Sequence, residues 1–252
     1  YCDKILLLHQ GKQIAFDTPD QIFSREDLMQ YGVNPPAYTR ICKALGVKKE
    51  NGCYPASFQD TLARKDQFPK ETDLQSQNQK NSQNVENNRK STEQQNRSVD
   101  FHSAKVNDCG KEENSTKEIF KIDQLSFSYT ENIPILKDLN LTVNNCPTAI
   151  IGQNGAGKTT LVKLLKGLLK PVSGSIYYGG ENIAEKTVAM LAGEIGYVFQ
   201  NPDDQIFKYH VMDEVMFGPL NIGMTNERAR EKAMQALATV GLQNLADENP
   251  YD

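Results

Sequence analysis

The stretch that most constrains this chain is a glycine-rich loop at residues 152–160, which reads GQNGAGKTT and follows the apolar run 148–151. It fits the pattern GxxxxGK[ST], in which glycines let the backbone wrap around phosphates and the next helix turns its free N–H groups toward them. Lys158 supplies a positive charge for the β- and γ-phosphates, and Thr159 supplies a hydroxyl ligand for Mg²⁺. The pattern predicts that the chain binds a nucleoside triphosphate.

The residues around the loop favour this interpretation over an ordinary glycine-rich turn. Residues 148–151 are typical of a buried strand and residues 159–169 of a helix, so the loop joins a strand to a helix as phosphate binding requires. The helix is apolar around most of its circumference, and Lys163, Lys166 and Lys170 are predicted to mark one solvent-exposed edge. A basic amphipathic membrane helix is the alternative, but the wide apolar arc favours burial.

Composition argues against several classes of function. The formal net charge is −4 and the sequence shows no basic stripe interleaved with aromatic residues, so nucleic acid is not an expected partner. The five cysteines are scattered without CxxC spacing and the three histidines have no companions at ligand spacing, so neither a disulfide framework nor a zinc site is predicted. No apolar run reaches about 18 residues, so any membrane contact is expected to go through a partner.

Residues 72–117 are predicted to be a disordered linker, because residues 75–98 are dominated by Gln, Asn, Ser and charged side chains. Such a segment cannot bury enough apolar surface to offset its ordering entropy. An aggregation-prone Gln/Asn segment is the alternative, although Lys, Arg and Glu interrupt it. The linker divides the chain into a front part, residues 1–71, and a rear part, residues 118–252.

Both parts show strand and helix patterns. The front part predicts a hairpin of residues 4–9 and 12–16, followed by short helices over 19–32 in two pieces, 36–45 and 57–64. The rear part predicts two antiparallel strands on either side of residues 130–134, further strands over 174–178 and 194–199, and helices over 187–191 and 225–240. The front part is too short to be a convincing domain by itself.

Several of these residues resemble the ATP-binding subunits of ABC transporters. The loop reads IIGQNGAGKTT, Phe199 and Gln200 end a predicted strand as the family's Q-loop does, and Tyr129 lies where the family places an aromatic residue that stacks on adenine. Residues 200–207 (QNPDDQIF) and 213–223 (DEVMFGPLNIG) are more specifically similar to the ATPases of energy-coupling factor importers for vitamins and metal ions.

This resemblance implies an α/β fold with the P-loop NTPase core of an ABC ATPase and an antiparallel β subdomain, together with the disordered linker. Residues 1–71 are similar to the C-terminal end of one ABC domain, and residues 118–252 to the N-terminal half of a second. The signature sequence, Walker B strand and switch histidine of the second domain are expected after Asp252, so the ABC core is expected to be incomplete. We therefore expect this chain to hold ATP without the groups needed for turnover.

The resemblance also implies site residues. ATP is expected to contact Tyr129 and the loop residues Gly152, Gln153, Asn154, Gly155, Ala156, Gly157, Lys158, Thr159 and Thr160. Mg²⁺ is expected to be bound by Thr159 and Gln200, while Lys158 and Gln200 are the expected catalytic residues. On the residues alone, Tyr129 is equally a packing side chain of a half-buried strand, and Gln200 an ordinary amide at a strand end.

The function implied is that of the ATP-binding component of an energy-coupling factor importer. Such a protein is an ATPase, peripheral at the cytoplasmic face of the membrane, that drives uptake of a vitamin or metal ion. Its implied partners are a transmembrane scaffold subunit and a substrate-binding membrane subunit, with two ABC domains pairing around ATP. A soluble tandem ABC protein acting on ribosomes and a non-functional truncated fragment are the alternatives, but the Gln/Asn-rich linker and QNPDDQIF favour transport over ribosomes.

Overall fold

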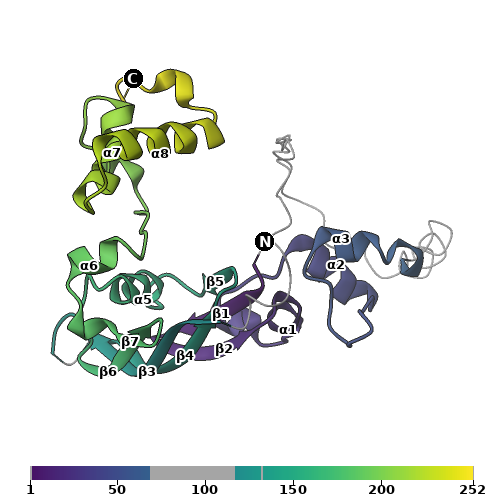
Figure 1. Cartoon of the computed structure of the whole chain (residues 1–252). Coiled ribbons are helices and arrows are strands. Elements are labelled where there is room, and N and C mark those ends of the chain that lie inside the picture. The colour runs from purple at the N-terminus through teal and green to yellow at the C-terminus, as the bar shows by residue number, and fades with distance from the viewer. Residues whose placement is uncertain (1, 69–116, 132, 252) are drawn as a thin grey trace, which may run out of the picture.

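The computed structural model describes residues 2–68, 117–131 and 133–251. The predicted linker lies outside the described residues, except for residue 117. Two β-sheets and the helix that follows the glycine-rich loop lie in the middle of the molecule, with the front helices on one side (Figure 1). Helices α7 and α8 form a separate lobe, to which the chain runs from α6 through an extended segment.

The predicted front hairpin is confirmed, and its first strand also joins the front part to the rear part. Strand β1 (Lys4–His9) pairs antiparallel with β2 (Lys12–Asp17). On its other edge β1 pairs in parallel with β5 (Thr148–Ile151), the strand that leads into the glycine-rich loop. The sheet order is therefore β2-β1-β5, and the hairpin folds as the neighbour of the loop's own strand.

Strand β1 is buried on both of its faces, because Ile5, Leu6, Leu7 and Leu8 are each at most 2% exposed. Leu6 and Leu8 belong to the main apolar cluster, whereas Ile5 and Leu7 pack on the opposite face. A continuous apolar run of this kind is typical of a central strand with parallel pairing. Each such side chain contributes about 1.5–3 kcal/mol when it is removed from water.

The second sheet is antiparallel and confirms the strands predicted around residues 130–134 and 174–178. Its order is β4-β3-β6-β7, with bounds Glu118–Ser128 for β3, Pro134–Asn144 for β4, Ser173–Tyr178 for β6 and Glu181–Asn182 for β7. Helix α5 (Lys158–Leu165) packs between this sheet and β1, since Leu161 and Leu164 are fully buried in the main apolar cluster. The burial of α5 confirms the predicted core helix and contradicts the alternative of a membrane-surface helix.

The short helices predicted in the front part are confirmed, and a further 3-10 helix, η2, follows them without having been predicted. Their bounds are Pro19–Ser24 for α1, Leu28–Tyr31 for the 3-10 helix η1, Ala37–Leu45 for α2, Phe58–Leu62 for α3 and Lys65–Gln67 for η2. Lys49 joins two of them, because its ammonium lies 2.5 Å from a carboxylate oxygen of Asp20 and 3.1 Å from one of Asp60. The hydrogen bond to Asp20 raises the pKa of Lys49.

The remaining elements are short helices and the α7–α8 pair. Their bounds are Ile183–Glu185 for η3, Val188–Ala192 for α6, Pro202–Asp204 for η4, Val211–Asn221 for α7, Asn226–Thr239 for α8 and Gln243–Leu245 for η5. Helix α8 confirms the predicted amphipathic helix, and Ala229, Ala233 and Leu237 pack against Met212 and Met216 of α7. Among the described helices, none has both the length and the apolar character that a bilayer crossing requires.

The strand predicted over residues 194–199 is wrong. These residues, EIGYVF, are rich in the β-branched and aromatic side chains that strands favour, but they run as irregular backbone after α6. A strand requires a hydrogen-bonding neighbour, and no described strand pairs with them. Val198 is consequently 83% exposed. The local composition did not show that these residues have no described strand to pair with.

Two predictions about α5 are also wrong. The helix ends at Leu165, earlier than the predicted residue 169, because Gly167 adopts a left-handed φ of +76° and the Leu168 N–H returns to the Lys163 carbonyl. Lys166 was predicted to lie on a solvent-exposed edge but is only 9% exposed. Its ammonium lies against backbone carbonyls of α6 and of the segment that follows α6.

The buried ammonium of Lys166 donates hydrogen bonds to two backbone carbonyls, one in α6 and one in the segment that follows it. The acceptors are Leu191 in α6, at 3.4 Å, and Ile195 just beyond it. Burial lowers the pKa of Lys166. Because buried ammonium groups require acceptors, this side chain fixes the start of the segment that leads to Gln200.

Replacing Lys166 by Met keeps the apolar stem but leaves the two carbonyls without their donor. We expect Lys166→Met to lower the free energy of unfolding by about 1–3 kcal/mol. The measurement is urea denaturation followed by circular dichroism. The matched control is Lys170→Met, at an exposed position, which is expected to change stability by less than about 0.5 kcal/mol. Equal denaturation midpoints for the two variants would contradict the structural role of Lys166.

Candidate nucleotide-binding site

The glycine-rich loop connects β5 to α5, so the predicted strand, loop and helix order is confirmed. Two of its glycines are required by close contacts. A Cβ on Gly152 would lie 2.2 Å from the Leu8 carbonyl oxygen, and one on Gly157 would lie 2.7 Å from the Leu136 side chain. Gly157 also has a left-handed φ of +99° at the N-cap of α5. The loop is therefore held tightly at both ends.

The middle of the loop is open to solvent, while its base is buried. Gln153, Asn154 and Gly155 are exposed, whereas Ala156 is 2% exposed and belongs to the main apolar cluster. Helix α5 begins at Lys158, and the first-turn N–H groups of a helix have no intrahelical acceptors. An open loop beside unpaired amides at a helix N-terminus is suited to binding an anion.

Lys158 is the first residue of α5, and its side chain reaches back across the loop. Its ammonium donates to the carbonyl oxygens of Gly152, at 2.9 Å, and Gln153, at 2.8 Å. The positive charge is thus held against the loop's own backbone, where a bound phosphate would be its stronger partner. The phosphate-binding role of Lys158 stays a prediction.

Tyr129 follows β3, and the structure brings it to the loop. Its hydroxyl lies 3.3 Å from the hydroxyl of Thr160, which is 7% exposed in the first turn of α5. The ring packs edge-on against Phe127, with centroids 4.9 Å apart, and Tyr129 remains 58% exposed. An exposed ring beside the helix N-terminus is available for stacking on a planar group.

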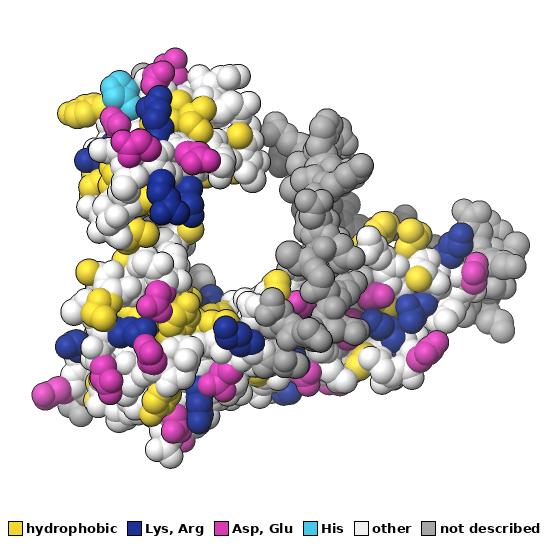
Figure 2. All heavy atoms as spheres, viewed as in Figure 1, with side chains coloured by type: hydrophobic (Ala, Val, Ile, Leu, Met, Phe, Trp, Pro, Cys, Tyr) yellow, Lys and Arg dark blue, Asp and Glu magenta, His cyan; other side chains and the backbone are white. Residues whose placement is uncertain are grey.

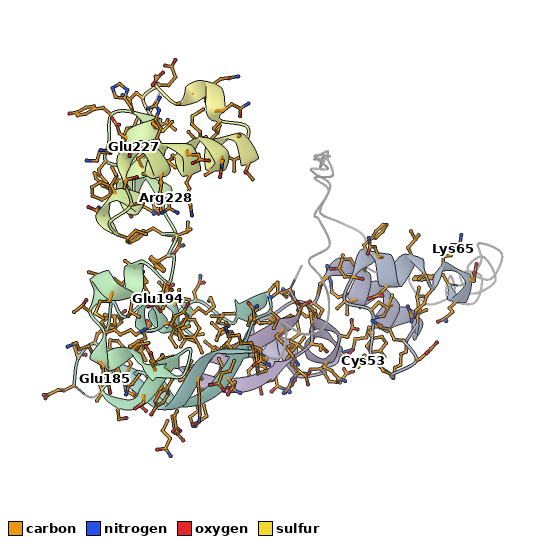
Figure 3. The ribbon with its side chains drawn as sticks, in the orientation of Figure 1. Cys53, Lys65, Glu185, Glu194, Glu227 and Arg228 are labelled. Carbon is orange, nitrogen blue, oxygen red and sulfur yellow. The ribbon has the colours of Figure 1, made fainter. Side chains whose placement is uncertain are left out.

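The structure does not bring Gln200 to the loop. Gln200 is exposed in the irregular segment after α6, and no interaction among the described residues joins it to Lys158 or Thr159. Figure 3 shows Glu194 beside α6, where this segment begins, and Glu227 and Arg228 in the separate α7–α8 lobe. The metal and catalytic roles expected for Gln200 therefore stay predictions.

Sequence reasoning missed the residues of the front part that support the loop. The Gly11 N–H donates to the Ala156 carbonyl at 3.2 Å, and the Leu8 carbonyl packs against Gly152. These contacts come from the parallel pairing of β1 with β5, which joins residues more than a hundred positions apart. The local sequence pattern predicted a turn at Gly11 but did not indicate that this turn contacts the glycine-rich loop.

The site has the donor chemistry for Mg²⁺ bound together with phosphates. The side chain available at the loop is the Thr159 hydroxyl, which is exposed, and phosphate oxygens complete the hard oxygen set that Mg²⁺ prefers. Among the described residues, no group of three or more His, Cys, Asp or Glu side chains could hold a metal ion.

Acidic and basic side chains are interspersed over the visible face of the molecule (Figure 2).

The known proteins that this chain resembles are ATP-binding proteins of transporters. Residues 136–252 match the family described as ABC transporter. A putative ABC transporter ATP-binding protein of Pyrococcus furiosus is 45% identical over 125 residues, which are 50% of this chain and 48% of the relative. The energy-coupling factor transporter ATP-binding protein EcfA1 of Methanospirillum hungatei is 41% identical over 134 residues, 53% of this chain and 48% of the relative.

A third relative matches along both parts of the chain. It is a putative ABC transporter ATP-binding protein of Methanosarcina acetivorans, 30% identical over 252 residues, which are 99% of this chain and 38% of the relative. The chain spans less than half the length of each of these three relatives. Together with the strand, loop and helix geometry, the matches show that residues 136–252 are similar to the ATP-binding domains of ABC transporters.

Proposed function

We propose that this chain is part of the ATP-binding component of an energy-coupling factor importer, an ABC-type ATPase that couples ATP binding and hydrolysis to uptake of a vitamin or metal ion. The observation that carries the proposal is Lys158 lying across an open phosphate-binding loop. The similarity of the rear part to an energy-coupling factor ATP-binding protein supports the transport class.

ATP binding follows from the loop geometry. The phosphates would occupy the open middle of the loop, accept hydrogen bonds from its backbone and the first turn of α5, and draw Lys158 away from the Gly152 and Gln153 carbonyls. Thr159, with Gln200 from the segment after α6, would hold Mg²⁺, which neutralises charge on the phosphates. Tyr129 would stack on the adenine.

The proposal includes the organisation expected from the sequence. Residues 1–71 belong to one ABC domain and residues 118–252 to a second, and the two domains pair around ATP. The similarity of the Methanosarcina acetivorans relative along 99% of this chain supports such an arrangement within one longer polypeptide. Hydrolysis would then depend on groups contributed by both domains.

The segment that leads to the α7–α8 lobe supports a membrane partner. Val198 and Tyr209 are 83% and 82% exposed, and Phe207 between them is also exposed. Large apolar side chains gathered on one surface segment are typical of a protein interaction site. We propose that this segment docks on the transmembrane scaffold subunit, placing the protein at the cytoplasmic face of the membrane beside the substrate-binding subunit.

The first test concerns Lys158. Lys158→Ala removes a charged contact worth about 1.5–3 kcal/mol, so we expect Mg-ATP affinity to fall by about 10–100-fold in isothermal titration calorimetry. Lys163→Ala, on the same helix, is the matched control and is expected to bind as the parent does. Equal affinities of Lys158→Ala and the parent would contradict the proposal.

The second test concerns adenine. Stacking of a base on an aromatic ring is worth about 1–3 kcal/mol, so Tyr129→Ala is expected to weaken ATP binding by about 5–100-fold. Binding of inorganic tripolyphosphate, which has no base, is expected to stay unchanged, and Tyr129→Phe is expected to retain ATP affinity. An equal loss for ATP and tripolyphosphate would show that Tyr129 supports the loop and does not contact adenine.

The third test concerns the partner. We expect the chain to co-purify with an integral membrane scaffold subunit from detergent extracts of its own cells. The double variant Val198→Ser/Tyr209→Ser is expected to lose that association while binding ATP as the parent does. Met29→Ser/Leu62→Ser, which alters exposed apolar residues of the front helices, is the matched control. Co-purification with ribosomes in place of a membrane subunit would favour a soluble ABC protein.

A further inference from the structure

The turn between β1 and β2 is a two-residue turn at Gln10 and Gly11. The register pairs Leu8 with Gln13 and His9 with Lys12, so only these two residues lie outside the ladder. Both have positive φ, +47° for Gln10 and +79° for Gly11. This is the type I′ geometry that matches the twist of a hairpin, and glycine is strongly preferred at its second position.

Both backbone groups of Gly11 are bonded to the rear part of the chain. Its N–H donates to the Ala156 carbonyl in the phosphate-binding loop at 3.2 Å. Its carbonyl accepts from the Lys137 N–H of β4 at 2.9 Å. The turn therefore joins the phosphate-binding loop to strand β4 of the antiparallel sheet. Both contacts link residues that are more than a hundred positions apart in the sequence.

Steric contacts leave no room for a side chain at this turn. A Cβ on Gly11 would lie 2.1 Å from the Ile135 carbonyl oxygen. A Cβ on Gly157, the last glycine of the loop, would lie 3.2 Å from that same oxygen. The start of β4 thus lies against both the turn and the loop, so movement of the turn would reach the loop directly and through β4.

A second contact comes from the end of η1. Gly32 has a left-handed φ of +65°, and a Cβ there would lie 2.5 Å from two atoms of the Gln153 side chain. Gln153 is one of the two residues whose carbonyls receive the Lys158 ammonium. The front part therefore touches the loop from the turn at Gly11 and from the end of η1.

We propose that the β1–β2 turn is a positioning element of the phosphate-binding loop, with Gly11 as its central residue and Gly32 as a second support. The inference rests on the proposed nucleotide-binding function. By holding the loop in one conformation before the ligand arrives, these contacts lower the ordering cost of binding. The phosphate site is consequently built from both parts of the chain, although only the rear part carries its motif.

The test is Gly11→Ala, compared with the parent. We expect affinity for both Mg-ATP and inorganic tripolyphosphate to fall by about tenfold, since each 1.4 kcal/mol of added ordering cost is tenfold. Hydrogen exchange of the amides of residues 152–158, measured without nucleotide, is expected to become about tenfold faster, while amides of β3 and β4 keep their protection. Gly46→Ala is the matched control, because Gly46 has φ +69° but open space around it.

Unchanged affinity and unchanged loop exchange in Gly11→Ala would overturn the inference. If Gly11→Ala also loses protection in β3 and β4, Gly32→Ala decides: weaker binding of both ligands supports the inference, and parental binding overturns it. If the parent binds neither ligand, the proposed function fails. The exchange comparison then still decides the positioning role, since equal loop exchange in Gly11→Ala and parent contradicts it.

Discussion

The parallel pairing of β1 with β5 is the constraint on which the rest of this structure depends. It buries four consecutive apolar residues, 5–8, so that one strand packs against two different cores. The same pairing aligns the end of β1 with the start of the phosphate-binding loop. Since neither the hairpin nor β5 could bury its apolar surface alone, the stability of the sheet and the shape of the site have a common origin.

The loop illustrates how chemistry and geometry come from different parts of the chain. Its chemistry is local: glycines, a lysine and a threonine lie within nine consecutive residues. Its geometry depends on backbone carbonyls of Leu8 and Ile135, which close on the loop from two strands. The phosphate-binding motif is therefore supported here by a hairpin that precedes it by more than a hundred residues.

The segment between α6 and α7 has a different character. Lys166 anchors its beginning through two carbonyls, after which Val198 and Tyr209 stand almost fully in solvent. The chain then enters a lobe held by its own small core of methionine, alanine and leucine side chains. The segment is anchored at its start and exposes apolar side chains further along. These two features suit the role proposed for it, which is to connect the nucleotide site to a docking partner.

The sequence by itself determined the elements whose causes are local. The phosphate motif, the hairpin around Gly11, the antiparallel pair around residues 130–134 and the capped helix α8 could all be predicted, because turns, caps and periodicity act over a few residues. Only the tertiary structure decided that residues 194–199 form no strand, that Lys166 is buried and that Gly11 supports the loop. Each of these depends on a neighbour distant in sequence, and strand pairing, burial and close backbone approach have no local signature.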